Sequence, residues 1–337
     1  MRIHTQNTLT LHAPGRLHLG FLDPSGSRGR RYGSIGLVIE GFETEVELSA
    51  ALVDRVTADT VEGVAQTERA SACLRTLRER TGRREALHLR LLRVLPAHAG
   101  FGSGTQLALA IGRAFASWYG LEVDTPTLAH WLGRGLRSGI GIHGFDRGGL
   151  LVDGGPSTDG RPAPLLSRIA LPEDWRIVVV QDERERGLAG HDEANAMATL
   201  APMPAAHAAE ICHEVLMRVL PGAASAEFDT FALGVSRVQQ LLGEHYAPAQ
   251  NGRAYTSAAV GRLMHWVGTS ATQPAAIGQS SWGPTGFAIV ASQSRAEALV
   301  NAARAAGLIE PGLVPRIVAA RNHGAEITDT RASPRAR

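Results

Sequence analysis

Residues 96–106 read PAHAGFGSGTQ, a turn with three alternating glycines set between two regular segments. Residues 87–95 before the turn are strand-like, and apolar residues at helical spacing follow it as far as Trp118. Glycine permits positive φ and lets the backbone approach a ligand closely. The first N–H groups of a helix are unpaired and carry the positive end of its dipole. We therefore predict a strand–turn–helix unit that binds an anion.

The anion in this prediction is a phosphate group, because backbone N–H donors are joined here by the hydroxyl groups of Ser103 and Thr105. The competing interpretation is an ordinary glycine-rich helix entry in which Ser103 is the N-cap. The predicted phosphate-binding residues are Gly100, Gly102, Ser103, Gly104, Thr105 and Gln106.

The composition restricts the chemistry available to this site. The chain has no lysine, so all 34 of its basic Lys and Arg positions are arginine. Schiff-base chemistry, pyridoxal-phosphate attachment and a P-loop lysine are therefore excluded, while arginine keeps the planar fork that binds phosphates and carboxylates. The net charge of +2 creates no overall field that calls for nucleic acid.

The cysteines and the apolar runs indicate the compartment. Cys73 and Cys212 are far apart and outside metal-like spacing, so we expect no disulfide framework, no zinc site and a reducing environment. Residues 1–15 contain no signal-peptide core, and the run 177–180 is far too short for a membrane span. We expect a soluble cytoplasmic protein with small-molecule partners and neither nucleic acid nor a membrane.

Strands with helices between them favour an α+β fold over a doubly wound parallel sheet. We predict domains at 1–160 and 165–330, joined by the Pro/Gly/Ser segment 154–164, with a disordered basic tail at 331–337. The predicted strands are 8–11 and 16–22 around a turn at 13–15, then 44–48, 87–95, 148–153, 175–181, 287–291 and 315–319. The predicted helices are 66–80, 103–118, 204–219, 225–243, 255–268 and 295–306.

Short segments of the chain resemble the motifs of the GHMP kinases, in the same order. Ala13-Pro14-Gly15-Arg16 resembles the first motif, and the turn resembles the second, Pro-x-x-x-Gly-Leu-Gly-Ser-Ser-Ala. Ser138-Gly139-Ile140-Gly141, continuing to Gly148-Gly149, resembles the Ser-Gly-x-Asp stretch, and residues 277–285 take the place of the third motif. The resemblance implies a two-domain α+β GHMP-kinase fold, with a ribosomal-protein-S5-like N-terminal domain and a ferredoxin-like C-terminal domain. It also implies a homodimer.

The chain departs from the kinase pattern where the kinases carry their chemistry. Gly141 stands where many of them have an aspartate, Arg16 stands where lysine is common, and Ser-Gly-Thr-Gln replaces Ser-Ser-Ala. These departures are similar to one branch, the β-ribofuranosylaminobenzene 5′-phosphate synthases of methanopterin biosynthesis. The similar strings are RLHL at 16–19, GSIG at 33–36, GFGSGTQ at 100–106, SGIG at 138–141, FDRGG at 145–149 and QSSWGPT at 279–285.

Enzymes of that branch join phosphoribosyl diphosphate to 4-aminobenzoate or 4-hydroxybenzoate, with loss of CO2 and diphosphate. The resemblance thus implies a decarboxylating pentosyl (glycosyl) transferase that makes a C-riboside 5′-phosphate for tetrahydromethanopterin. It implies Mg2+ carried by the diphosphate, and no nucleotide, flavin or pyridoxal phosphate. Two alternatives stay open: an ATP-dependent small-molecule kinase that uses another carboxylate, and a non-catalytic GHMP protein that senses a metabolite.

The resemblance gives candidate catalytic roles to four side chains. His18 could donate to an anion or shuttle a proton, or be an ordinary strand histidine. Asp23 could hold magnesium or steady the sugar cation, or form a turn before Pro24. His98 lies inside the phosphate turn. Asp146 could position substrate hydroxyls, or belong to a turn beside Gly148-Gly149.

The remaining candidates bind substrate. Arg16 would add a guanidinium to the phosphate or to the benzoate carboxylate, and Trp282 would place its indole against the aromatic ring, with a buried structural tryptophan as the competing view. No metal ligand is assigned. The other predicted substrate-binding residues are Ser138, Gly139, Arg147, Ser280 and Ser281.

Overall fold

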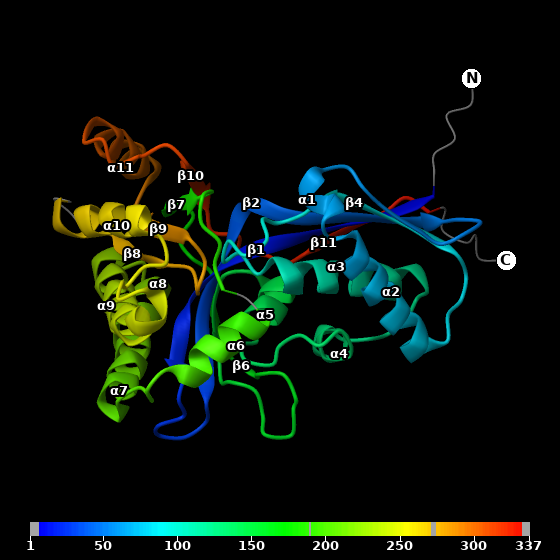
Figure 1. Cartoon of the computed structure of the whole chain (residues 1–337), viewed down its shortest axis with the longest axis horizontal. Coiled ribbons are helices and arrows are strands. Elements are labelled where there is room, and N and C mark those ends of the chain that lie inside the picture. The colour runs from blue at the N-terminus through cyan, green and yellow to red at the C-terminus, as the bar shows by residue number, and fades with distance from the viewer. Residues whose placement is uncertain (1–6, 189, 271–273, 332–337) are drawn as a thin grey trace.

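The chain forms two β-sheets with helices packed against them (Figure 1). The computed structural model describes residues 7–188, 190–270 and 274–331. The seven-stranded first sheet has the order β11-β1-β2-β4-β3, with β5 paired to β2 and β6 to β5; the second has the order β10-β7-β9-β8. In the first sheet the strands are β1 (Thr8–Asp23), β2 (Tyr32–Ala50), β3 (Arg55–Ala58), β4 (Leu87–Arg93), β5 (Leu150–Asp153), β6 (Leu165–Ile169) and β11 (Glu326–Asp329). In the second they are β7 (Arg176–Asp182), β8 (Ala276–Gln279), β9 (Thr285–Val290) and β10 (Leu313–Ala319).

The helices fall into two groups along the chain, and Figure 1 shows α6 between the two groups. Those of the first half are α1 (Val61–Val64), α2 (Thr67–Thr81), α3 (Ser103–Trp118), α4 (Thr125–Trp131) and α5 (Ile140–Arg147). Those of the second half are α6 (Gly190–Thr199), α7 (Ala205–Glu214), α8 (Leu220–Ala224), α9 (Phe228–Tyr246), α10 (Ala258–Ser270) and α11 (Gln293–Ala305). A π-helical segment, Val215–Val219, joins α7 to α8. None of the helices in the described ranges has the length and apolar character that crossing a bilayer requires.

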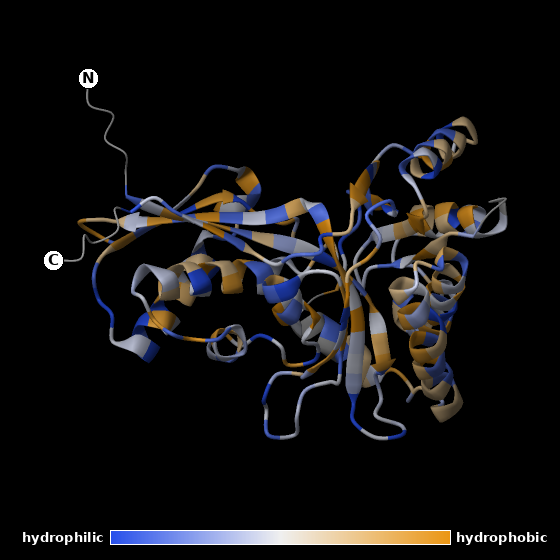
Figure 2. Cartoon of the chain, turned by 180° about the vertical axis from the view of Figure 1, so that it is seen from behind, coloured by the Kyte–Doolittle hydropathy of each residue, from blue (hydrophilic) through white to orange (hydrophobic). Residues whose placement is uncertain are grey.

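β1 is one long strand, and this corrects the predicted turn at 13–15. Its register against β2 shifts between Pro14 and Arg16 and again between His18 and Gly20. Pro14 has no N–H to donate to the ladder, and a bulge accommodates it by re-aiming the residues that follow. The long strands carry alternating apolar and polar residues (Figure 2). The alternation of apolar and polar residues is interrupted at the bulge, which is why the sequence predicted a turn there, but the strand continues through it.

Two hydrophobic clusters decide how the parts sit together. One lies between the first sheet and helices α2 and α3, and it contains Leu9, Leu11, Leu107 and Phe115. The other contains residues of both sheets and of α7 and α9; among its fully buried members are Leu17, Leu37, Ile177, Ile211, Phe231 and Phe287. Because this second cluster contains strand residues of both sheets, it holds the two sheets together, and the loops at the ends of their strands are held with them.

The chain crosses between the sheets at residues other than the predicted linker. Segment 154–164 is the loop between the paired strands β5 and β6, so it stays within the first sheet. The chain passes to the second sheet at 170–175, and it returns after β10 so that β11 pairs with β1. Both β6 and β11 therefore belong to the first sheet, although they lie in the predicted range 165–330. Of the predicted tail only Arg331 is described, and residues 332–337 lie outside the described residues.

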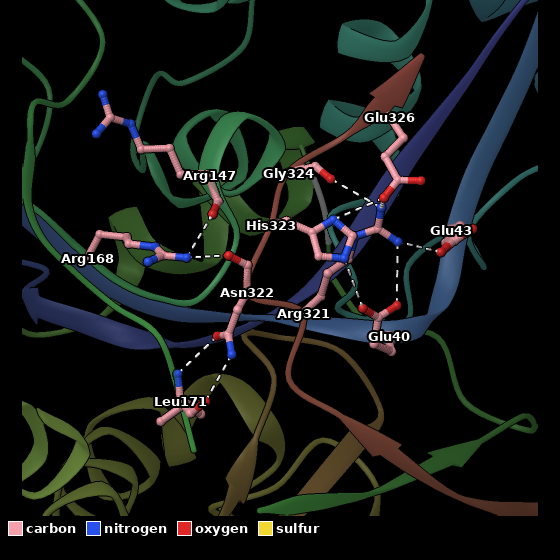
Figure 3. Close-up of polar contacts among 10 residues, drawn as sticks. All are labelled: Glu40, Glu43, Arg147, Arg168, Leu171, Arg321, Asn322, His323, Gly324 and Glu326. Atoms are coloured by element: carbon pink, nitrogen blue, oxygen red, sulfur yellow. Dashed lines mark hydrogen bonds and ion pairs between the residues drawn. The ribbon is translucent and has the colours of Figure 1, made fainter. Parts of the chain in front are cut away.

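Polar contacts tie the two crossings together (Figure 3). The Asn322 side chain makes two hydrogen bonds with the backbone of Leu171: Nδ2 donates to the carbonyl at 2.9 Å, and Oδ1 accepts the N–H at 3.0 Å. Arg321 is only 4% exposed and forms ion pairs with Glu43 at 2.8 Å, Glu326 at 3.3 Å and Glu40 at 3.4 Å. These contacts hold the returning segment against β2.

Candidate anion-binding site

Helix α3 begins at Ser103, as the sequence predicts, and its N-cap is Gly102. Gly102 has φ 79° and Gly100 has φ 93°, conformations that favour glycine. The Gly102 carbonyl accepts the N–H groups of Thr105 and Gln106, each at 3.0 Å. The N–H groups of Ser103 and Gly104 have no acceptor in the part of the chain that the structure describes. Ser103 is thus the first helical residue and not the N-cap, and two donors stay free for a ligand.

The loop after β8 closes one side of the turn. Ser280 Oγ donates to the Gly100 carbonyl at 2.7 Å and accepts the His18 N–H at 2.9 Å. The Ser281 N–H donates to the His18 carbonyl at 3.0 Å, and a Cβ on Gly283 would lie 2.5 Å from the Ala99 oxygen. The predicted residues Ser280 and Ser281 therefore lie beside the turn, and their contacts join it to β1.

Arg16 lies directly against the turn, where the bulge of β1 places it. Its Nη1 donates to the Gly100 carbonyl at 2.5 Å, and its guanidinium carbon lies 3.2 Å from the position of a Cβ on Gly102. Its Nε is buried without a hydrogen-bond partner in the described ranges. Burial lowers the pKa of Arg16 to about 10, opposed by the Glu193 carboxylate, so the group stays charged at neutral pH.

Gly141 and Gln106 pack α5 against the start of α3. Gln106 Nε2 donates to the Gly141 carbonyl at 2.9 Å, and a Cβ on Gly141 would lie 3.1 Å from Thr105 Cγ2. A side chain at position 141 would therefore press on Thr105, which would have to shift by a few tenths of an ångström. The site therefore gains a close helix–helix contact where a kinase would carry a carboxylate.

A buried aspartate that sequence reasoning missed holds the predicted residues Ser138 and Gly139. Asp153 is fully buried and accepts the Gly139 N–H at 2.8 Å, the Ser34 hydroxyl at 2.6 Å and the Ser138 hydroxyl at 3.3 Å. Burial raises its pKa, and the hydrogen bonds from Ser34, Gly155 and Gly139 oppose that rise. Asp153 thus positions the loop that leads into α5.

An ion pair between the two halves of the molecule lies near the turn. Arg137 Nη2 donates to Glu193 Oε2 at 2.6 Å, and the Glu193 side chain is 14% exposed. Burial raises the pKa of Glu193, while the charges of Arg137 and Arg16 lower it. Sequence reasoning missed this pair, because Glu193 lies in α6, 56 residues after Arg137, and no short spacing connects the two positions.

His18 is 3% exposed, and both of its ring nitrogens lack a partner among the described residues. Burial lowers its pKa to about 3, and the charges of Arg16 and Arg137 act in the same direction. His18 is therefore a neutral imidazole at physiological pH. It lines a small cavity of about 30 Å³, enough for one or two water molecules, together with Phe21, Tyr246, Gln279 and Trp282.

The other predicted site residues lie in different settings. Asp23 is 7% exposed and accepts bonds from its own loop, from the N–H groups of Ser25 and Arg28 and the hydroxyl of Ser27. His98 is exposed at φ 60°, and its carbonyl accepts the Gly187 N–H at 3.0 Å.

Trp282 is 2% exposed and packs on Tyr246, with ring centroids 4.5 Å apart. Trp282 is therefore buried against Tyr246, as the competing interpretation of a structural tryptophan expects.

Asp146 and Arg147 lie at the opposite end of α5 from Ser138 and Gly139. Asp146 is exposed and accepts the Thr125 hydroxyl at 2.6 Å. The Arg147 carbonyl accepts a hydrogen bond from Arg168, while its exposed side chain points away from that contact (Figure 3). The structure does not bring these two residues to the turn.

No group of three or more His, Cys, Asp or Glu side chains within the described ranges could hold a metal ion. The charged side chains against the turn are cationic, with Arg16 at Gly102 and both Arg69 and Arg134 at Gly104. Such a donor set suits an anion and does not provide the oxygen ligands that magnesium requires.

The chain is similar to known proteins along most of its length. Residues 68–149 match the family model of the GHMP kinases N terminal domain. A beta-ribofuranosylphenol 5′-phosphate synthase from Archaeoglobus fulgidus is 33% identical over 298 residues, which are 85% of this chain and 89% of that protein. A synthase of the same name from Methanothermobacter thermautotrophicus is 33% identical over 68% of this chain and 75% of that protein.

Solved structures show the same fold at low sequence identity. Homoserine kinase from Cytophaga hutchinsonii superposes with a TM-score of 0.66 at 14% identity, covering 97% of this chain and 99% of that one. Mevalonate diphosphate decarboxylase from Enterococcus faecalis gives 0.68 at 15% identity, covering 96% and 99%. These similarities confirm the predicted two-domain α+β GHMP-kinase fold.

Proposed function

Because the chain belongs to the family of beta-ribofuranosylphenol 5′-phosphate synthases, which are enzymes, we propose that it joins phosphoribosyl diphosphate to an aromatic carboxylic acid. The acid is 4-hydroxybenzoate or 4-aminobenzoate, and the reaction releases CO2 and diphosphate. The product is a C-riboside 5′-phosphate, which we assign to tetrahydromethanopterin biosynthesis. The observation that carries this proposal is the free, arginine-flanked N-terminus of α3 beside Gly141.

The reaction balances without an external oxidant or reductant. The bond from the sugar C1 to the diphosphate oxygen breaks, and the oxygen keeps the electron pair. The ring carbon that bears the carboxylate supplies the electrons for the new carbon–carbon bond to C1. The bond from that ring carbon to the carboxylate carbon then breaks, CO2 leaves, and its electron pair restores the aromatic ring.

The residues of the turn act mainly on the leaving group in this proposal. Charge develops on the diphosphate oxygen as the C1–O bond lengthens, so fixed N–H and guanidinium donors there lower the barrier. The N–H groups of Ser103 and Gly104 and the guanidinium of Arg16 supply those donors. Their contribution is preorganised, because the loop after β8 and the carbonyl of Gly100 hold Arg16 and the turn in place.

Magnesium enters this scheme as part of the substrate. A diphosphate in solution carries Mg2+, which neutralises part of its charge. The chain contributes arginines around the turn, and Glu193, the carboxylate that acts on Arg16, is already paired with Arg137. We therefore propose no protein-held metal site.

A sharp test uses carboxyl-labelled acids with the full chain. The protein is incubated with phosphoribosyl diphosphate, Mg2+ and either labelled 4-hydroxybenzoate or labelled 4-aminobenzoate, and labelled CO2 and diphosphate are measured. We expect equal molar release of both, dependent on the donor and on one of the acids. Release of ADP from ATP with a small alcohol would support the kinase alternative instead. Donor binding without release of CO2 from either acid would contradict the proposed reaction and leave the sensor alternative.

A further inference from the structure

Two more arginines reach the start of α3 from elements far apart in the sequence. Arg69 belongs to α2, and Arg134 follows α4. Figure 1 shows α2 beside α3 on the helical side of the first sheet, and the elements are in contact. A Cβ placed on Gly104 would lie 3.5 Å from Arg69 Nη1 and 3.5 Å from Arg134 Nη1. Both guanidinium groups therefore converge on one backbone position of the turn.

Neither guanidinium has a carboxylate partner within the described ranges. The side chain of Arg69 is exposed and donates only to the Gln66 amide oxygen, at 3.2 Å. The side chain of Arg134 makes no hydrogen bond or ion pair with the described residues, and its Nε is buried. Burial lowers the pKa of Arg134, the nearby Cys73 thiol opposes that shift, and the charge of Arg69 adds to it. Two like charges brought together without a counterion are unfavourable, so an anion at this point would relieve the repulsion.

The groups around the turn are donors on two flanks. Arg16 lies at Gly102 on one flank, and Arg69 and Arg134 lie at Gly104 on the other. Positions two residues apart are separated by roughly 5–7 Å, so a single phosphoryl group can bridge the two flanks only with few hydrogen bonds to each of them. Two linked phosphoryl groups can contact both flanks at once, with the free N–H groups of Ser103 and Gly104 between them.

We infer that Arg69 and Arg134 form an outer subsite for a diphosphate, whose inner phosphoryl group lies at Arg16 and Gly102. This inference rests on the proposed function for the class of ligand, and it names residues that the motif does not contain. The outer subsite holds the terminal phosphoryl group through guanidinium forks, which suit phosphate oxygens in two-point contacts. It distinguishes a diphosphate donor from a monophosphate and holds the diphosphate as it leaves.

The test is binding of inorganic diphosphate and of inorganic phosphate to the full chain, measured by calorimetry at fixed Mg2+ and salt. Arg69→Gln and Arg134→Gln remove one guanidinium each, and Arg80→Gln is the matched control. Arg80 is exposed on the same helix as Arg69, roughly 16 Å further along its axis. We expect at least a tenfold loss of diphosphate affinity in each site variant, less than a threefold change for phosphate, and no change in the control.

Two results would overturn the inference. One is unchanged diphosphate affinity in both site variants, and the other is an equal loss of phosphate and diphosphate affinity. Arg69 is exposed, so its variant reports on binding even where Arg134→Gln folds poorly. The acceptor acid is absent from these measurements, which separates them from the proposed reaction. If the wild type releases no CO2 but the site variants selectively lose diphosphate binding, the proposed reaction is contradicted and the subsite is retained. If CO2 release is normal and the KM for the donor is unchanged in both variants, the reaction is retained and the subsite is contradicted.

Discussion

Arginines gather in two regions of this molecule, and the regions differ in whether those arginines have carboxylate partners. At the crossing after β10, Arg321 is surrounded by Glu40, Glu43 and Glu326, and its Nη2 also donates to the Gly324 carbonyl at 3.1 Å (Figure 3). At the start of α3, Arg69 and Arg134 lie beside Gly104, whose N–H is free, and neither has a carboxylate partner among the described residues. The first group satisfies its charge within the fold, whereas the second leaves its charge for a ligand.

The contrast separates arginines that stabilise the fold from arginines that bind. A buried cation that has partners is destabilising to remove, because the partners are left behind. A cation without partners adds repulsion to the empty protein, so its loss costs little stability and appears in binding. Burial alone does not distinguish the two groups, since Arg134 and Arg321 both have a buried Nε that lacks a partner within the described ranges.

The largest expected effect is on stability at the crossing. Arg321→Met should lower the free energy of unfolding by about 3 kcal/mol, because three carboxylates lose their shared cation. Denaturant titration measures this effect, with Arg134→Met as the matched substitution at the turn. We expect Arg134→Met to change the unfolding free energy by less than about 1 kcal/mol. Equal losses in the two variants would remove the distinction between the regions.

The next effect is on binding at the turn. Gly102→Val should weaken phosphoribosyl diphosphate binding at least a hundredfold, about 2.7 kcal/mol, since the new side chain meets the Arg16 guanidinium and is strained at φ 79°. Gly160→Val is the control for strain, because Gly160 has φ 81° and nothing lies within 4 Å of its Cβ position. Calorimetry on both folded variants checks the result. Retained affinity in Gly102→Val would show that the turn does not hold the donor.

A third effect is spread over several pH units and is the smallest near neutral pH. His18 has a pKa of about 3 in the folded protein against 6.5 for an ordinary histidine, so the unfolded chain binds the extra proton between these values. Its contribution to stability is complete above pH 6.5 and is lost as the pH falls toward 3, by up to about 1.4 kcal/mol per pH unit. The measurement is the unfolding free energy of the wild type minus that of His18→Asn across pH 4–7. Parallel pH profiles would contradict a buried neutral imidazole.

The local features of the site were predictable from the sequence, and the long-range ones were not. The start of α3 at Ser103 and the tight turn before it depend on neighbouring glycines, whose conformations are set within a few residues. Arg69 and Arg134 belong to the site only because α2 and α4 pack against α3. Glu193 belongs to it because α6 lies across from Arg137. No spacing along the chain records these contacts.

The motifs also predicted that Asp146 and Arg147 belong to the site, whereas the fold places them away from it. Asp146 and Arg147 adjoin Gly148-Gly149 in the sequence, but α5 separates them from Ser138 and Gly139. The buried carboxylate that organises this loop is Asp153, which lies in a strand that reads as apolar. The linker was misplaced for a related reason, since a Pro- and Gly-rich stretch marks a loop without showing whether it connects two strands of one sheet.

The pairing of β11 with β1 determines when the protein can finish folding. Leu9 pairs with Asp329, and the Thr8 N–H donates to the hydroxyl of Thr330, 322 positions later. At ordinary rates of translation, roughly 15–60 s separate the synthesis of these two ends. Throughout that time one edge of β1 has no neighbour, and an unpaired strand edge is a template for association with other chains. The nascent polypeptide therefore exposes this edge of β1 to other chains until β11 has been synthesised.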